Sequence, residues 1–196
     1  MSDTSDTPKA LSGIRVIDFS RIVAGPHCTM CLADLGADVI KIEDTGKGDD
    51  LRNHKPPHIE CDSPYFLSLN RNKQSIAIDM AAPEGRDVIL ELMSEADVLV
   101  ENFRTGVMEK FGFGYESLKN RFPQLVYCSI SGYGREGSQK SRAAYDPIVQ
   151  AESGQMATNG SVESGPMRTG LAVTDTQTGH FAVQGILAAL FARERS

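Results

Sequence analysis

The sequence predicts an α/β fold built on an open, doubly wound, mostly parallel sheet. Short runs of β-branched and apolar residues alternate with segments of helical periodicity, which is the pattern of such sheets. The 196 residues suffice for one α/β core or for part of a larger protein. Ligands of these folds collect beyond the carboxyl ends of the strands. We therefore expect ligand contacts in residues 21–26, 44–48, 102–104 and 131–135.

The first segments predict one βαβ unit. Residues 14–20 (IRVIDFS) are apolar and β-branched, as expected for a buried strand. A turn and a short helix over residues 26–35 follow, with Pro26 at the first helical position and Gly36 just beyond the end. Residues 38–43 (DVIKIE) predict the next strand, and the crossover should be right-handed.

A second unit follows a long polar segment. Residues 44–64 are rich in glycine, proline and charge without periodicity, and they predict a surface loop. A helical turn over residues 65–69 precedes a strand over 75–79. A helix over 83–96 and a strand over 97–101 (DVLVE) complete the unit.

The alternation continues toward the C-terminus. Two short helices are expected within residues 102–122, and residues 125–131 (LVYCSIS) predict another buried strand. A helix is expected to begin at Pro147 with Asp146 as its N-cap. Residues 158–168 predict a loop.

Asp175 lies where a short apolar run, residues 171–174, meets an apolar helix that reaches residue 192. One interpretation makes it the helix N-cap, because Asp accepts an amide hydrogen bond from the first turn. The other places its carboxylate at a strand-to-helix corner, facing a cleft, as a nucleophile. In both cases the helix N-terminus is expected to lower the pKa of Asp175.

The composition excludes several classes of protein. Hydrophobic residues make up 40% and charged residues 23%, as in soluble globular proteins, and the net charge of −6 argues against a nucleic-acid partner. No apolar run approaches the roughly 18 residues that span a bilayer, so no membrane partner is expected. Residues 1–10 are polar rather than signal-like, which predicts a flexible N-terminus and a cytoplasmic protein.

The four cysteines, Cys28, Cys31, Cys61 and Cys128, are expected to be isolated thiols. Cys28 and Cys31 form a CxxC pair, which occurs in redox and zinc sites. The sequence shows neither a second CxxC nor a histidine cluster to complete four ligands. Packing within the first helix is therefore favoured, and no metal is expected.

Six segments together resemble the class III CoA-transferases, a family that includes formyl-CoA:oxalate CoA-transferase, carnitine CoA-transferase and α-methylacyl-CoA racemase. The segments are LSGIRVIDFSRIVAGP, LGADVIKIE, YFLSLNRNKQSIAIDM, EADVLVENFRTGVMEKFG, CSISGYG and LAVTDTQTGHFAVQGILAALFARERS. They follow the family's order and spacing over nearly the whole chain. The resemblance implies the N-terminal part of the family's large domain, a CoA-binding, Rossmann-like domain over residues 11–196.

The resemblance implies a CoA-transferase that moves CoA from an acyl-CoA donor to a carboxylic acid acceptor. Asp175 is then the catalytic residue, which attacks acyl-CoA to form a mixed anhydride and next carries CoA as an aspartyl thioester. The positions that match CoA contacts in the family are Val23, Ala24, Ile78, Asp79, Met80, Ala81, Asn102, Phe103, Arg104, Lys110, Ala143, Ala144, Tyr145 and Asp146.

Four of these positions have a second interpretation. Arg104 and Lys110 either pair with the phosphates of CoA or are solvated surface cations. Asn102 either contacts the ligand or caps the helix that follows it. Phe103 is expected to be a core residue whose ring edge touches the ligand.

Three positions depart from the family members named above. Val23 replaces a glutamine of the formyl-CoA enzyme, which disfavours formate and oxalate. Asp44 replaces an arginine near the adenine, so that contact is in doubt. Tyr145 replaces the histidine that the racemase pairs with its aspartate, and a phenol with a pKa of about 10 is a poor base at neutral pH. Transfer is therefore favoured over racemisation or isomerisation, and His180 is expected on the far side of its helix.

The resemblance also predicts an incomplete chain. Family members continue beyond Ser196 into a linker and a small domain, so this chain resembles an N-terminal half. Full-length relatives are interlocked homodimers, and either such a dimer or a separate C-terminal half is the expected partner. The apolar face of residues 181–191 should be poorly covered. The competing interpretation is a non-catalytic CoA-binding or assembly fragment.

Overall fold

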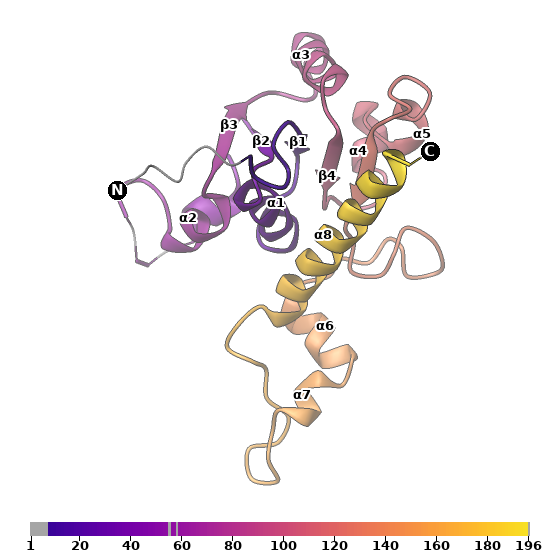
Figure 1. Cartoon of the computed structure of the whole chain (residues 1–196). Helices are drawn as coiled ribbons and strands as arrows, with labels where there is room; N and C mark the ends of the chain where they lie inside the picture. The colour runs from indigo at the N-terminus through magenta and orange to yellow at the C-terminus, as the bar shows by residue number, and fades with distance from the viewer. Residues whose placement is uncertain (1–7, 55, 58, 196) are drawn as a thin grey trace.

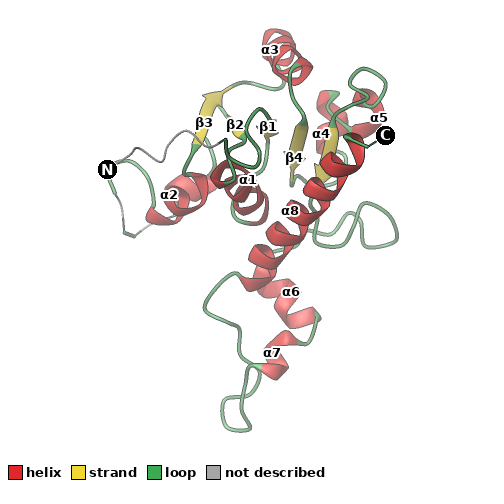
Figure 2. Ribbon diagram, in the orientation of Figure 1, coloured by secondary structure: helices red, strands yellow, loops and turns green. Residues whose placement is uncertain are grey.

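A five-stranded parallel sheet forms the centre of the computed structural model, which describes residues 8–195 except residues 55 and 58. The strands are β1 (Arg15–Asp18), β2 (Asp38–Glu43), β3 (Lys73–Ala77), β4 (Val98–Glu101) and β5 (Val126–Ser129). Their order is β3-β2-β1-β4-β5 and every pairing is parallel (Figures 1 and 2). Because the direction of winding reverses between β1 and β4, the predicted doubly wound sheet is confirmed.

Helices cover both faces of this sheet. They are α1 (Ala24–Asp34), α2 (Pro64–Asn70), α3 (Pro83–Ser94), α4 (Val107–Phe111), α5 (Tyr115–Leu118), α6 (Asp146–Glu152), α7 (Gln155–Thr158) and α8 (Val173–Arg193), with a 3-10 turn η1 (Asp50–Asn53). Successive strand residues point to opposite faces. Val16 and Val98 pack with α1 and α8, whereas Ile17 and Leu99 pack with α3, α4 and α5. Helix α8 is thereby held beside α1.

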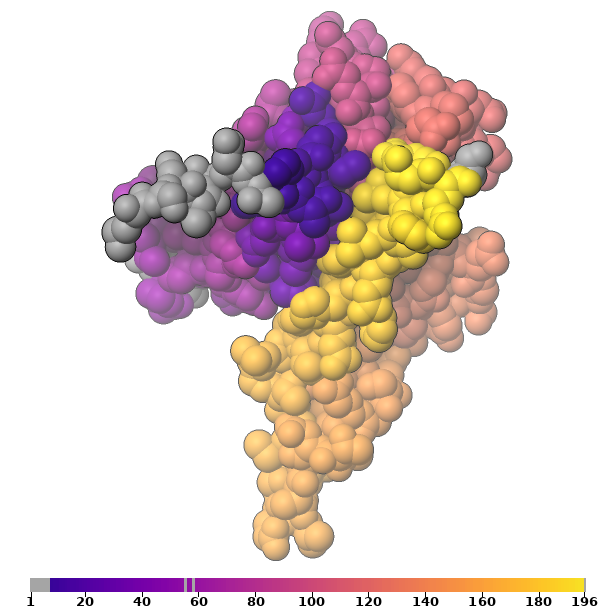
Figure 3. All heavy atoms as spheres, in the orientation of Figure 1, coloured from indigo at the N-terminus to yellow at the C-terminus, as the bar shows by residue number. Residues whose placement is uncertain are grey.

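The segment from α6 to the start of α8 projects away from the sheet as a narrow arm (Figure 3). Large apolar side chains of this arm and of α8 face solvent, among them Leu171 at 80% exposure and Phe181 at 68%. The expected poor cover of residues 181–191 is confirmed only for Phe181 and Phe191, because Val183, Ile186 and Leu190 are buried against the sheet. No helix among the described residues is long and apolar enough to cross a membrane.

Two boundaries near the arm differ from the sequence predictions. Helix α8 begins at Val173, so the apolar run before Asp175 forms no strand and Asp175 lies inside the first helical turn rather than at the N-cap. Helix α6 begins at Asp146 with Tyr145 as N-cap, so Asp146 does not cap its own helix. Both predictions were wrong for one reason: Asp146 binds the start of α8 instead.

A buried carboxylate closes the end of β1. Asp18 is fully buried and accepts hydrogen bonds from the Ser20 amide (2.9 Å) and the Thr29 hydroxyl (2.6 Å). The ammonium of Lys73 lies 3.1 Å from its Oδ2. Burial by itself raises the pKa of Asp18, but the charges of Lys73 and Lys41 and the hydrogen bonds from the Ser20 and Thr29 hydroxyls outweigh it and lower the pKa to about 2.

Replacing Asp18 with alanine should lower the free energy of unfolding by about 3–5 kcal/mol, because Lys73 loses its countercharge inside the protein. Urea denaturation measures this loss. Asp34→Ala, which breaks a more exposed pair with Arg71, is the control and should cost less than about 1 kcal/mol. If both variants lowered the free energy of unfolding by less than about 1 kcal/mol, the stabilising role of the buried pair between Asp18 and Lys73 would be contradicted. The stabilisation by Asp18 is present above pH ~3.8 and lost as the pH falls toward about 2, since folding lowers its pKa.

Candidate functional site

A cleft of about 210 Å³ opens where the loops after β1 and β4 diverge, at the switch point of the sheet. Its lining comes from those loops, from the loop after β5, from the segment before α6 and from α8. It contains nine predicted site residues, namely Val23, Ala24, Asn102, Phe103, Arg104, Ala143, Ala144, Tyr145 and Asp175. The other predicted positions, Ile78, Asp79, Met80, Ala81, Lys110 and Asp146, are not part of this lining.

Asn102 joins the two loops that form the mouth of the cleft. Its side-chain oxygen accepts from the Arg21 amide (2.8 Å) and its amide group donates to the Arg21 carbonyl (2.7 Å). Ile22, which follows Arg21, has a φ of 68°, a strained value for a β-branched residue. Its backbone amide donates a hydrogen bond to the Asp49 carboxylate (3.1 Å). Asn102 is therefore no helix cap, and it fixes the turn that carries Val23 into the cleft.

The start of α8 is capped by a side chain from another helix. Ala172 at the N-cap position supplies no side-chain hydrogen bond. Instead the buried carboxylate of Asp146 accepts from the backbone amides of Thr174 (2.8 Å) and Asp175 (3.3 Å). Its second oxygen is held by the Gln150 amide at 2.5 Å. Because Asp146 satisfies these amides, the carboxylate of Asp175 is not needed as a cap.

Asp175 lies between the cleft and an adjoining cavity of about 140 Å³, and it lines both. Burial raises the pKa of its half-buried carboxyl to about 6, with a further contribution from the charge of Asp146. The predicted lowering of the pKa was wrong, because burial and the neighbouring carboxylate oppose the helix end. Within the described part of the chain, no lysine, arginine or histidine forms an ion pair with Asp175. At pH 7, above this pKa, the Asp175 carboxyl is still mainly ionised.

Several cations surround the mouth of the cleft. The sequence predicted ligand contacts at Arg104 and in the range 21–26, which includes Arg21. It did not indicate Lys140 and Arg142, which lie in a loop without a recognisable signal. Arg142 pairs with Glu152, whereas Arg104 and Lys140 form no ion pair with any residue that the structure describes. These two side chains are therefore available to an anionic ligand.

Some predicted contacts lie elsewhere. The ammonium of Lys110 is 5.7 Å from the Phe111 ring centroid on α4. Asp44 accepts hydrogen bonds from the amides of Gly46 and Lys47, so it shapes its own loop and does not line the cleft. Conversely, Tyr65 on α2 was missed. Burial raises the pKa of Tyr65, and the charges of Asp175 and Asp146 raise it further, although Tyr65 lines neither the cleft nor the adjoining cavity.

Comparisons with known proteins identify the family. The model of CoA-transferase family III matches residues 11–196. Succinyl-CoA:glutarate CoA-transferase of Mus musculus is 46% identical over 97% of this chain and 44% of its own length. Formyl-CoA:oxalate CoA-transferase of Streptomyces coelicolor is 42% identical over 97% of this chain and 46% of its own. The chain thus spans about half the length of the curated relatives it matches.

Solved structures share the fold. A CAIB/BAIF family protein from Brucella suis superposes with a TM-score of 0.92 at 42% identity, covering 96% of this chain and 51% of that one. The protein Rv3272 from Mycobacterium tuberculosis gives a TM-score of 0.88 at 40% identity, covering 97% and 53%. The parallel sheet, the cleft at its switch point and these matches lead to one conclusion: the chain belongs to CoA-transferase family III.

Proposed function

We propose that this protein transfers CoA between carboxylic acids, with Asp175 as the nucleophile. The observation that carries the proposal is the position of Asp175: a half-buried carboxylate without a countercharge among the described residues, in the first turn of α8, between two connected cavities. Such a group is ionised at neutral pH yet more basic than an ordinary aspartate, as a carboxylate nucleophile should be.

The proposed reaction conserves the activated acyl bond. A carboxylate oxygen of Asp175 attacks the acyl-CoA carbonyl, the CoA thiolate leaves, and a mixed anhydride results. The thiolate then attacks the aspartyl carbonyl, which releases the first acid and leaves CoA as an aspartyl thioester. The acceptor acid attacks this thioester to form a second anhydride, and the thiolate returns to the new acyl group. Water must be kept away from these intermediates.

The acids are proposed to be dicarboxylates of the succinate and glutarate type. Curated relatives from Mus musculus and Agrobacterium fabrum are named for succinate and glutarate. In this chain Arg104 and Lys140 line the cleft without ion-pair partners among the described residues, so one of them can bind the distal carboxylate. Val23 offers no side-chain hydrogen bond to a small acid such as formate.

The alternatives rest on other features. Racemisation would need a base beside the substrate, and Tyr145, which lines the cleft, is a phenol. A fragment that only binds CoA would fit the half-length match to the relatives. The partner remains a proposal as well: a homodimer or a separate C-terminal half would cover the exposed phenylalanines of α8.

Asp175 should be trapped as an adduct when the complete protein is mixed with succinyl-CoA and then hydroxylamine or borohydride. Peptide mass spectrometry should locate the modification at Asp175 and leave Asp50, the other carboxylate lining the cleft, unmodified. Asp175→Ala should abolish transfer. The proposal fails if no adduct forms and Asp175→Ala keeps full activity. Exchange of the α-proton into deuterium oxide without an acceptor acid would favour racemisation instead.

The rate of transfer should fall as the pH drops through about 6, because the Asp175 carboxylate becomes protonated. Asp146→Asn removes the neighbouring charge but keeps an oxygen that can cap α8. The fall in rate at low pH, the acid limb of the pH profile, should therefore move to lower pH. Measurement of kcat/KM against pH checks the shift. Asp50→Asn removes a charge from the same cleft and should leave the limb in place. An acid limb that does not move in Asp146→Asn would contradict the electrostatic account.

Arg104→Ala should weaken the binding of CoA by about tenfold or more, since a hydrogen bond to a charged group contributes about 1.5–3 kcal/mol. Lys110→Ala is the matched control and should have a smaller effect, because Lys110 lies outside the cleft lining. Isothermal titration calorimetry with CoA compares the two. Equal losses of affinity would show that the phosphates bind across α4 rather than in the cleft.

A further inference from the structure

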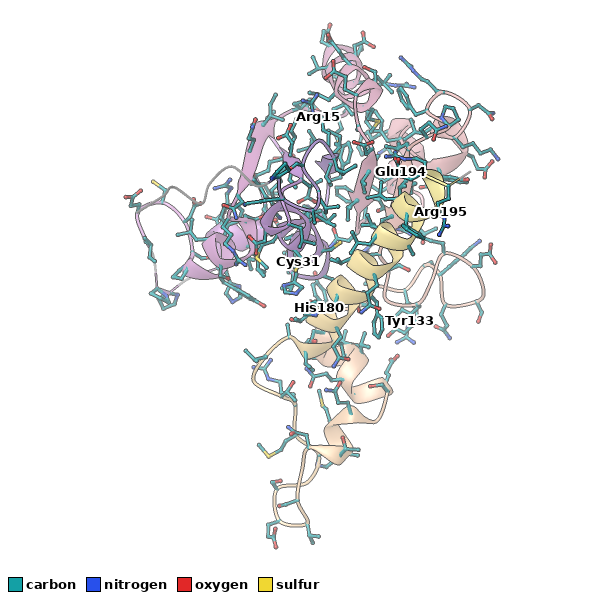
Figure 4. All side chains as sticks on the ribbon, in the orientation of Figure 1. Arg15, Cys31, Tyr133, His180, Glu194 and Arg195 are labelled. Atoms are coloured by element: carbon teal, nitrogen blue, oxygen red, sulfur yellow. The ribbon has the colours of Figure 1, made fainter. Side chains whose placement is uncertain are left out.

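Three metal-ligand side chains meet between α1 and α8, outside both cavities. His27 and Cys31 stand one turn apart on α1, and His180 lies close to them on α8. Figure 4 shows Cys31 and His180 on these two neighbouring helices. The Nε2 atoms of His27 and His180 are 3.3 Å apart, and the Cys31 Sγ lies 3.9 Å from Nε2 of His27. All three donor atoms fall within 4.8 Å of one another. His180 lines neither the cleft nor the adjoining cavity, as expected for a side chain on the far side of α8 from Asp175, and it faces α1 instead.

The close approach of the two helices depends on Gly179. A Cβ atom at this position would lie 2.8 Å from the Ala24 carbonyl oxygen and 2.9 Å from Cδ2 of His27. Only glycine lets α8 come so near α1, and the adjacent His180 is thereby brought to His27. The convergence of the three donors is thus a consequence of backbone packing and not of one mobile side chain.

The spacing fits a tetrahedral ion. With Zn–N bonds of about 2.0–2.1 Å and Zn–S bonds of about 2.3 Å, tetrahedral angles require N–N separations of about 3.3 Å and N–S separations of about 3.6 Å. The two histidine nitrogens are 3.3 Å apart and the Cys31 sulfur is 3.9 Å from His27, close to these values. The separation of Cys31 from His180 is within 4.8 Å, so rotation of the Cys31 or His180 side chain must bring this pair closer when the ion binds. Two imidazoles and one thiolate are also the donors that zinc prefers.

We propose that His27, Cys31 and His180 bind one divalent ion of the zinc type, with the fourth position taken by water or an external ligand. On binding, Cys31 releases its proton to solvent and the two histidines coordinate as neutral rings. Neither the cleft nor the adjoining cavity is lined by these residues. The ion would therefore connect α1 to α8 and does not take part in the transfer chemistry.

The charged side chains near this site are bound to other groups, so they leave the three metal-ligand side chains accessible to an ion. Arg71 pairs with Asp34, and the ammonium of Lys73 is held by Asp18, by the Pro26 carbonyl and by Asn70. Cys28 is fully buried in the apolar layer beneath α8 and points to the core. Of the CxxC pair, only Cys31 is therefore placed to bind the ion, and the fold supplies the histidines that the sequence did not reveal.

Cobalt provides the direct test, because a tetrahedral Co²⁺ site with a thiolate has a characteristic charge-transfer absorption. The complete protein, freed of metal with a chelator, should bind one equivalent of Co²⁺ with this absorption, and Zn²⁺ should displace it. His180→Ala alters an exposed residue and Cys31→Ser is nearly isosteric. Each should raise the Kd for Co²⁺ by about 100-fold or more, since even the loss of an outer-shell partner costs about 10- to 100-fold. Cys61→Ser, which removes an exposed thiol elsewhere, should bind normally.

Thermal unfolding gives a second readout that does not depend on catalysis. Zn²⁺ should raise the Tm of the wild type and of Cys61→Ser in a concentration-dependent manner, and it should leave the Tm of His180→Ala unchanged. The absence of stoichiometric Co²⁺ binding in the folded wild type would overturn the proposal. Equal binding by His180→Ala and Cys31→Ser, with circular dichroism confirming that both are folded, would overturn it as well. Neither result bears on the role of Asp175.

Discussion

Each carboxylate buried at the carboxyl ends of the strands needs a positively charged partner, and the structure on this side of the sheet depends on that requirement. Three of the strands end in a buried acidic residue, and an unpaired charge in such a position is strongly destabilising. Each is matched by a cation from a following segment. The pairs are Asp18 with Lys73, Glu43 with Arg52 and Glu101 with Arg135. These contacts hold the segments that follow the strands. Of the two carboxylates that line the cleft, Asp50 pairs with Arg21 and Lys47, whereas Asp175 forms no ion pair with any described residue.

The contrast between Asp146 and Asp175 explains how such a group is tolerated. Asp146 receives the first amides of α8, so it carries the charge that belongs at a helix N-terminus. Asp175 follows in the same turn, repelled by Asp146 and partly shielded from water, and its pKa rises to about 6. The structural role and the proposed chemical role are thus divided between two neighbouring carboxylates. Sites of this kind commonly combine a well-satisfied framework with one unsatisfied reactive group.

Much of the sheet was predictable because buried parallel strands are continuous apolar runs, and residues 38–43 (DVIKIE) coincide with β2. The start of α8 was not, because its cap comes from a residue 28 positions earlier. The same holds for the mouth of the cleft, where Asn102 binds Arg21 across 81 positions. Local patterns carry no information about such pairs. The resemblance to a known family located Asp175, but only the three-dimensional neighbours determine the direction of its pKa shift.

Oxygen-18 labelling tests the central claim most directly, because the proposed steps transfer an atom from the substrate to one aspartate. When the acceptor acid attacks the aspartyl thioester, one of its carboxylate oxygens becomes the bridge of the anhydride, and it stays on Asp175 when CoA takes the acyl group. Turnover of the complete protein with an oxygen-18-labelled dicarboxylate should therefore place the heavy isotope in the peptide that contains Asp175. Turnover that leaves this peptide unlabelled would contradict a covalent role for Asp175.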